Sequence, residues 1–139
     1  MLMSFIFCFK LKSLIAQRRN EMASRSTLIK FQNETSVTLT LNYVTLQHGI
    51  WTDNMYPPQT IPPGGNASFQ AESNGFMTGD QGTVQYLAGS EGIVELDFDN
   101  PFSGGNSYGG SAPKNYHLNW SGGGGNNATV VFTLTPASA

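Results

Sequence analysis

Charged side chains are scarce in this 139-residue chain, and most of the positive ones stand near its beginning. Asp, Glu, Lys and Arg make up 12% of the residues, about half of the average share in globular proteins. From Ser26 onward there are two basic residues against eight acids, a net charge of −6. This balance excludes a general nucleic-acid-binding protein, because neutralising phosphates requires a basic patch. It also disfavours attachment to anionic lipid by charge alone.

Cysteine is nearly absent as well. Cys8 is the single cysteine, which excludes an intrachain disulfide and a cysteine-based zinc site. The length is that of one domain, which can bury about two-thirds of its unfolded surface without cross-links. We therefore expect one hydrophobic core, held together by packing.

No segment has the apolar spacing of an amphipathic helix. From Leu28 onward, apolar and polar residues alternate instead, which is typical of half-buried β-strands. The apolar phase flips between Tyr43 and Val44, which indicates a bulge or a bend between two sheets. Strands are expected around residues 29–31, 37–46, 67–73, 83–87, 93–99, 115–120 and 128–135. The side chains expected to point inward include Phe69, Ala71, Val84, Tyr86, Val94, Leu96, Phe98, Tyr116, Leu118, Trp120, Val130, Phe132 and Leu134.

The connections between these strands are rich in Gly, Pro, Asn and Ser, as in residues 57–66, 99–115 and 121–127. Short strands separated by such turns favour an all-β fold, either a single antiparallel β-sandwich or a related barrel. We assign residues 27–136 to this domain. No second domain or internal repeat is evident.

Residues 1–26 differ in composition from the domain. An apolar run, Met1 to Phe9, precedes the basic residues instead of following them, which is a poor match to a secretory signal. The run is also too short to span a bilayer. Three interpretations stay open: a disordered leader or a mis-assigned start with Met22 as the natural one, a basic amphipathic surface helix, or an unusual export signal.

Nothing in the sequence points to an enzyme. His48 and His117 lack the neighbouring ligands of a metal site, and the GxSxG motif of serine hydrolases is absent. The glycine runs lack the GK[ST] of a phosphate-binding loop. We expect neither catalysis nor a cofactor or metal.

Three acids stand on one face of a single expected strand. Glu95, Asp97 and Asp99 alternate with apolar residues, so their mutual repulsion should raise the pKa of at least one of them. The stripe is either a solvated outer face or a receptor for a cationic group.

Five aromatic residues stand in or beside the expected loops: Trp51, Tyr56, Phe76, Phe102 and Tyr108. Trp and Tyr are suited to a membrane interface, since each joins an apolar ring to a polar group. Some of the five could instead cap the ends of a sandwich. We do not expect all five to do so.

Three long motifs occur in a fixed order: AESNGFMTGDQGTVQY, then DFDNPFSGGNSYGG, then GGGGNNATVVFTLT, with HGIWT before them. Together they resemble the aegerolysin family, and most closely its bacterial branch, which contains the small subunit of a crystal-forming binary insecticidal toxin. The resemblance runs from about Leu28 to Thr135. It implies a β-sandwich likened to that of the actinoporins, without enzymatic activity.

The family resemblance also implies partners. Members bind membrane sphingolipids, with or without sterol, and many form pores together with a larger perforin-like or lectin-like protein. Members usually lack a classical signal peptide. We therefore expect release without such a signal, or storage in the cytoplasm or in a crystalline inclusion, before action at a target membrane.

The family resemblance also implies which residues contact lipid. Trp51 matches a lipid-contacting tryptophan of fungal members, and Phe98 and Phe102 lie in the segment that holds another. A glutamate of fungal members has no direct equivalent, since Asp80 and Gln81 stand near its place. Asp80 is the candidate substitute.

The hypothesis that combines these signals is a membrane-lipid-binding protein, the small component of a two-component cytolytic or insecticidal toxin. Loops carrying Trp51, Tyr56, Phe102 and Tyr108 would enter the membrane interface, and Asp80 with Asp99 would accept hydrogen bonds from a headgroup. A glycan-binding lectin is the alternative, because aromatic rings beside Asn and Asp also suit sugars. A structural or crystal-forming protein is the third.

Overall fold

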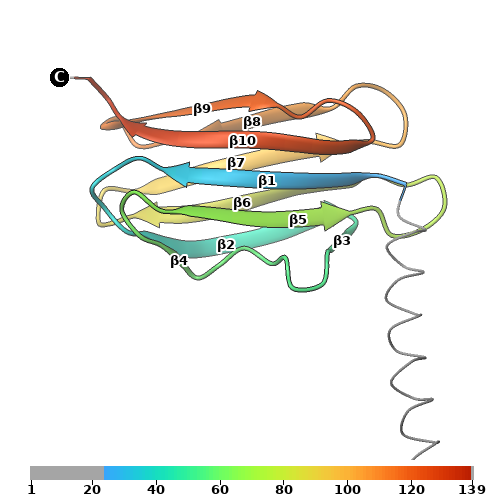
Figure 1. Cartoon of the computed structure of the whole chain (residues 1–139), viewed down its shortest axis with the longest axis horizontal. Helices are drawn as coiled ribbons and strands as arrows, with labels where there is room; N and C mark the ends of the chain where they lie inside the picture. Colours follow the sequence, from blue (N-terminus) through green and yellow to red (C-terminus); the bar gives the residue numbers. More distant parts are fainter. Residues whose placement is uncertain (1–23, 139) are drawn as a thin grey trace, which may run out of the picture.

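The computed structural model describes residues 24–138, whose regular secondary structure is all β-strand. Ten strands of this stretch form two five-stranded sheets that pack face to face (Figure 1). The strands are β1 (Ser26–Asn33), β2 (Leu39–His48), β3 (Ile50–Trp51), β4 (Thr60–Ile61), β5 (Asn66–Glu72), β6 (Asp80–Ala88), β7 (Ile93–Asn100), β8 (Ser107–Ser111), β9 (Tyr116–Gly122) and β10 (Asn127–Pro136). The expected all-β sandwich is confirmed. The interpretations of the leader up to residue 23 lie outside the described residues.

The first sheet has the strand order β3-β5-β1-β10-β9, and the second has the order β4-β2-β6-β7-β8. The pairings in both sheets are antiparallel, except that β1 and β10 run parallel. A parallel pair cannot be joined by a tight hairpin, and here the two strands come from opposite ends of the described chain. Their pairing joins the first and last strands of the described chain within the first sheet.

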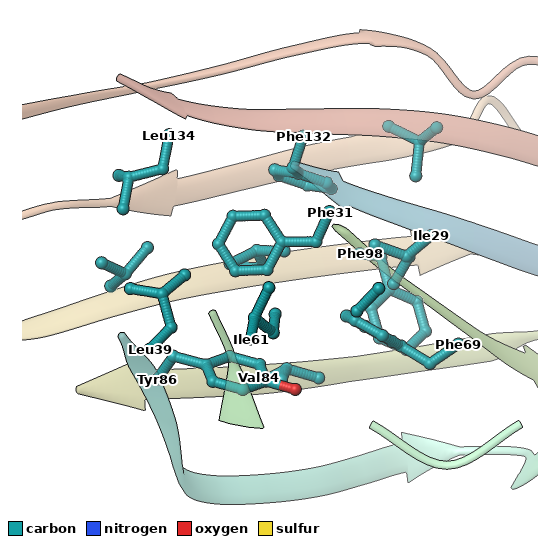
Figure 2. Close-up of a cluster of buried hydrophobic side chains, with 14 of the residues drawn as sticks. Ile29, Phe31, Leu39, Ile61, Phe69, Val84, Tyr86, Phe98, Phe132 and Leu134 are labelled. Atoms are coloured by element: carbon teal, nitrogen blue, oxygen red, sulfur yellow. The ribbon is translucent and has the colours of Figure 1, made fainter. Parts of the chain in front are cut away.

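The core lies between the sheets and combines aromatic rings with a larger number of aliphatic side chains (Figure 2). Phe31, Phe69 and Phe132 from the first sheet meet Tyr86 and Phe98 from the second, all nearly inaccessible to solvent. Burial alternates residue by residue along β6 and β7, as period-two patterning requires. Each such side chain contributes on the order of 1.5 to 3 kcal/mol by leaving water.

Most of the expected inward positions are confirmed, but Trp120 is not fully inside. Its ring lies 5.7 Å from that of Phe132, on the inner side of the sheet, yet 41% of the side chain is exposed. The reason is that β9 is the outer strand of its sheet, so no further strand of residues 24–138 covers the far side of the ring.

Strand β8 was not expected, because its sequence, SYGGS, looks like part of a loop. It pairs with β7 over five residues. Gly110 is required there, since a side chain would collide with the Glu95 backbone and approach Leu118 Cδ2 to 2.7 Å. Glycine at this position makes the sequence look less like a strand, but the close packing between the sheets requires it.

The phase flip near Tyr43 is a bulge. The register between β2 and β6 shifts between Leu41 and Tyr43, and again between Leu46 and His48. Strand β2 stays in one sheet throughout, so the alternative of a corner between sheets is wrong. Pairing resumes on the far side of each shift.

Three loops gather at one end of the sandwich: residues 73–79, 101–106 and 123–126, at the right in Figure 1. We call this the crossing end, because residues 73–79 carry the chain from β5 in the first sheet to β6 in the second. The Asn100 side chain ties this end together by donating hydrogen bonds to the carbonyls of Ser26 and Asn126, both at 3.0 Å. The opposite end is formed by residues 34–38, 62–65, 89–92 and 112–115.

Candidate functional site

A cleft of about 400 Å³ opens at the crossing end. It lies where the 73–79 loop meets the start of β6 and the ends of β2 and β7. Its apolar lining includes Met77, Pro101 and Phe102, and its polar lining includes His48, Asp80, Gln81 and Asp99.

Asp80 is the unusual residue of this cleft. Its side chain is fully buried, and neither carboxyl oxygen forms a hydrogen bond of good geometry with a donor among residues 24–138, although the Thr27 hydroxyl lies close enough to lower its pKa. Burial raises its pKa to about 7. The nearby Thr27 hydroxyl lowers the pKa, and the charges of Asp99 and Glu72 raise it by smaller amounts.

Gly49 allows the chain to close over this carboxyl group. Its φ of +92° suits glycine, and a Cβ at that position would lie 2.5 Å from the Glu72 carbonyl oxygen and 3.0 Å from Asp80 Cβ. The turn between β2 and β3 therefore packs directly against Asp80.

Two further buried groups lie near Asp80 without partners in the described part of the chain: Thr27 Oγ1 and Glu72 Oε2. Glu72 ends β5 and Asp80 begins β6, so the two acids bracket the crossing loop. An unpaired buried polar group costs about 1 to 3 kcal/mol, so several of them in one place require an explanation, such as a bound water molecule, ion or ligand. Chemically, this cluster can accept hydrogen bonds from an amine or a hydroxyl group.

A second hollow of about 380 Å³ lies on the outer face of β6, β7 and β8 and shares Gln81 and Asp99 with the cleft. The stripe of three acids is on this face, as expected. Thr83 donates a hydrogen bond to Asp97 at 2.7 Å, and Gln85 donates one to Glu95 at 2.7 Å.

The expected rise in pKa along the stripe is found at Asp97. Its first cause is partial burial, however, while Thr83 lowers the pKa and Glu95 raises it. The Thr83 and Gln85 partners are those of an ordinary polar sheet face.

Trp51 and Tyr56 lie together on one edge of the sandwich, outside both hollows. The Trp51 ring is half-buried and lies 5.8 Å from Tyr56, 6.2 Å from Phe69 and 6.1 Å from Phe98. Phe98 itself is 2% exposed, so its ring belongs to the core and not to the surface. The rings run in series from the core outward to Tyr56, which is 53% exposed.

The segment that carries Tyr56 is fastened to the core. The Tyr86 hydroxyl donates a hydrogen bond to the Pro58 carbonyl at 2.6 Å. Burial raises the pKa of Tyr86, so this hydroxyl remains a donor.

Phe102 and Tyr108 lie at the crossing end in different settings. The Arg25 guanidinium is 4.9 Å from the centre of the Phe102 ring and donates a hydrogen bond to the Phe102 carbonyl at 2.7 Å. The Tyr108 ring points between the sheets, 6.4 Å from Phe132, and its hydroxyl donates to the Gly123 carbonyl at 2.8 Å. Burial raises the pKa of Tyr108, and the Asp80 charge adds to this.

The structure thus brings together Asp80, Asp99 and Phe102 in one cleft. Trp51 and Tyr56 form a separate pair, and Tyr108 and Phe98 are mainly packing residues. The positions of Glu72 and Thr27 beside Asp80 were not predicted from the sequence. The sequence offered one indication of this cluster: two acids, Glu72 and Asp80, stand on either side of a seven-residue turn.

No group of three or more His, Cys, Asp or Glu side chains within residues 24–138 is placed to hold a metal ion. Within the same residues, no helix is long and apolar enough to cross a bilayer.

The family model described as Aegerolysin matches residues 25–135. An uncharacterized protein of Dictyostelium discoideum is 43% identical over 65 residues, which is 47% of this chain. The match spans only 6% of that protein's length.

Three solved structures share the fold. The lipid binding protein Nakanori has a TM-score of 0.75 at 14% identity, covering 89% of this chain and 80% of that chain. RahU in complex with a TRIS molecule has a TM-score of 0.70 at 18% identity, covering 84% and 98%. IP-1A from Alcaligenes faecalis has a TM-score of 0.67 at 18% identity, covering 88% and 97%.

Proposed function

This chain belongs to the aegerolysin family, and from that premise we propose that it is a non-enzymatic protein that binds a membrane lipid. The lipid is a sphingolipid, with or without sterol in the membrane. The protein acts as the small component of a two-component pore-forming toxin, beside a larger perforin-like or lectin-like partner. Before it acts at the target membrane, it is released by a route other than a classical signal peptide, or it is stored in the cytoplasm or in a crystalline inclusion.

The observation that carries the proposal is the unpaired Asp80 carboxyl group, buried in the cleft at the crossing end. A headgroup amine or hydroxyl would supply the hydrogen bonds that the fold does not. Asp99, which lines the same cleft, adds a second acceptor. The structural relative RahU is described with bound TRIS, a small amine that carries hydroxyl groups.

Aromatic rings near the crossing end supply the apolar part of the binding energy. Phe102 lines the cleft, and Tyr56 with Trp51 offers a partly exposed pair on the neighbouring edge. Each ring buried in the membrane contributes on the order of 1.5 to 3 kcal/mol. Two or three such rings are enough for useful binding by a domain that carries a net negative charge.

The proposal is tested by sedimentation with vesicles that vary in sphingolipid (sphingomyelin or ceramide phosphoethanolamine) and in sterol. We expect Phe102→Ala and Tyr56→Ala each to weaken binding about tenfold. Tyr43→Ala is the matched control, because Tyr43 is 52% exposed on β2, nearly the same as Tyr56. Vesicle binding unchanged in both Trp51→Ala and Phe102→Ala would contradict insertion of these rings.

The pore-forming role has its own readout. Dye release from vesicles should require both this protein and its larger partner, and neither alone should release the dye. Release by this protein alone would contradict the two-component proposal and leave lipid binding intact.

A glycan-binding lectin is the second candidate function, because Tyr56 and Trp51 also form a platform on which a sugar ring could stack. Competition separates the two. Inhibition of target binding by free sugar but not by lipid vesicles would favour the lectin, and a purely structural protein would show neither.

A further inference from the structure

Phe76 and Met77 form the most exposed apolar pair in residues 24–138. Phe76 is 91% exposed and Met77 is 57% exposed. They stand side by side in the middle of the 73–79 loop, the segment that crosses from β5 to β6 at the crossing end. We call these two residues the 76–77 tip. Neither contributes to the buried core.

The backbone holds this tip in a conformation that a methionine disfavours. Met77 has a φ of 57°, a region that only glycine, and less readily Asn or Asp, adopts without strain. Such a conformation costs about 1 to 3 kcal/mol and points to a role outside folding. A large apolar side chain therefore occupies a position where folding would favour glycine.

The base of the loop is fixed on both sides. The backbone N–H groups of Ser24 and Arg25 both donate to Ser73 Oγ at 3.0 Å. Gly79 packs so closely against the Asn100–Pro101 backbone that a Cβ there would lie 2.8 Å from Pro101 Cα. Within the loop, Thr78 Oγ1 donates to the Gly75 carbonyl at 3.0 Å. The tip thus projects from a braced turn.

The two ends of the sandwich differ in charge. Residues 73–79, 101–106 and 123–126, which form the crossing end, contain no Asp, Glu, Lys or Arg. The loops of the opposite end carry Glu34, Glu91 and Lys114. Entering an apolar medium is costly for charged groups, so of the two sets of loops only the crossing-end loops are free of this cost. Charged groups do lie beside these loops: Arg25 donates a hydrogen bond to the Phe102 carbonyl, and Asp80 and Asp99 line the cleft.

We propose that the 76–77 tip inserts into the hydrocarbon layer of a lipid bilayer, below the level of the headgroups. The inference rests on the proposed lipid-binding function and deepens it. Phe and Met lack the polar handle that keeps Trp and Tyr at the interface, so they suit the acyl-chain region. The cleft, which Met77 also lines, would lie at headgroup level directly above. The strands then stand steeply to the membrane, with the opposite end in water.

The first test is vesicle sedimentation with Phe76→Ser and Met77→Ser. We expect each to weaken binding about tenfold to vesicles of sphingomyelin and cholesterol or of ceramide phosphoethanolamine and cholesterol. Ile93→Ser is the matched control, because Ile93 is 43% exposed at the opposite end, and it should bind as the wild type does. Phe76→Leu should retain binding. The temperature of unfolding should not fall in the tip variants.

The second test locates the tip. An environment-sensitive dye is attached through Met77→Cys in a Cys8→Ser background, and through Ile93→Cys as the control. On vesicle binding, the dye at position 77 should brighten and be quenched by nitroxides placed on the acyl chains, whereas the dye at position 93 should not change.

The outcomes distinguish failure of the tip proposal from failure of the lipid-binding function on which it rests. Sedimentation with vesicles but no acyl-chain quenching at position 77 overturns the tip proposal and leaves lipid binding standing. Sedimentation with none of the vesicles overturns both. If Phe76→Ser instead abolishes self-association and leaves vesicle binding unchanged, the tip is a contact between copies of the chain and the proposal is wrong.

Discussion

At the residue scale, the Asp80 carboxyl group is buried at 0% exposure, and its pKa is about 7 in the fold against an ordinary value of 3.8. Between these two values the folded state keeps a proton that the unfolded state has released. The contribution of Asp80 to the free energy of unfolding is therefore greatest at pH 3.8 and below. It falls as the pH rises to about 7 and is constant above that pH. The loss amounts to at most about 4 kcal/mol.

We expect Asp80→Asn to raise the free energy of unfolding at pH 8 and to flatten its dependence on pH between about 4 and 7. Denaturant unfolding at pH 5 and pH 8 measures both effects. Glu34→Gln, which removes an exposed carboxylate at the opposite end, should leave the difference between the two pH values unchanged. A variant that loses stability at pH 8 would show that the ionised carboxylate has partners that stabilise it.

The same substitution should weaken binding to vesicles, because the amide lacks the charge that attracts a headgroup amine. More stable but less active is the pattern expected when a fold keeps a costly group for function. Thr27 and Glu72 belong to the same unpaired cluster. Their positions could not be inferred from the sequence, since they come together only when β1, β5 and β6 are packed.

At the scale of elements, β6 shows why glycine can be required in the middle of a strand. Gly82 pairs with Leu46 on β2 and with Phe98 on β7. A Cβ at this position would lie 2.6 Å from the Thr45 carbonyl oxygen, 2.7 Å from Leu46 Cδ2 and 2.9 Å from Phe98 Cζ. The glycine leaves room for the Phe98 ring and for the bulged part of β2.

Gly82→Ala should therefore destabilise the domain by about 1 to 3 kcal/mol, because two strands and a core ring must shift. Gly105→Ala is the control: a Cβ there meets nothing within 4 Å, and the expected change is within about 0.5 kcal/mol. Thermal or denaturant unfolding measures both. Equal stability of the two variants would mean that β2 adjusts freely at its bulge.

At the scale of the whole molecule, residues 24–138 contain three basic residues and eight acids, a net charge of −5. The crossing-end loops contain none of these charges. Binding through a headgroup and apolar side chains does not depend on long-range attraction, in contrast to binding through a basic surface.

We therefore expect vesicle binding to persist when salt is raised from about 50 to about 500 mM. Adding an anionic lipid to the vesicles should weaken binding at low salt, and high salt should relieve this effect. Sedimentation over the two series gives the answer. Stronger binding to the anionic vesicles at low salt, lost at high salt, would instead indicate attachment through the basic residues between Lys10 and Arg19.

The sequence by itself determined the fold class, the core and most strands, because apolar alternation depends only on which side of a strand each residue faces. It placed Phe69, Phe132 and Tyr86 inside and located an irregularity near Tyr43, which the structure shows to be a bulge. The resemblance in its motifs identified the family. Strand β8 was missed, because its glycines serve contacts with distant residues.

Only the tertiary structure decided the candidate site. The burial of Asp80, the exposure of Phe76 and the enclosure of Phe98 depend on which loops meet at an end of the sandwich. The Asp80 carboxylate becomes buried and Phe76 becomes exposed only after the two sheets have packed and the crossing loop has joined them. Local sequence carries no information on how the loops pack at this end, because the contacts that position them join residues far apart in the chain.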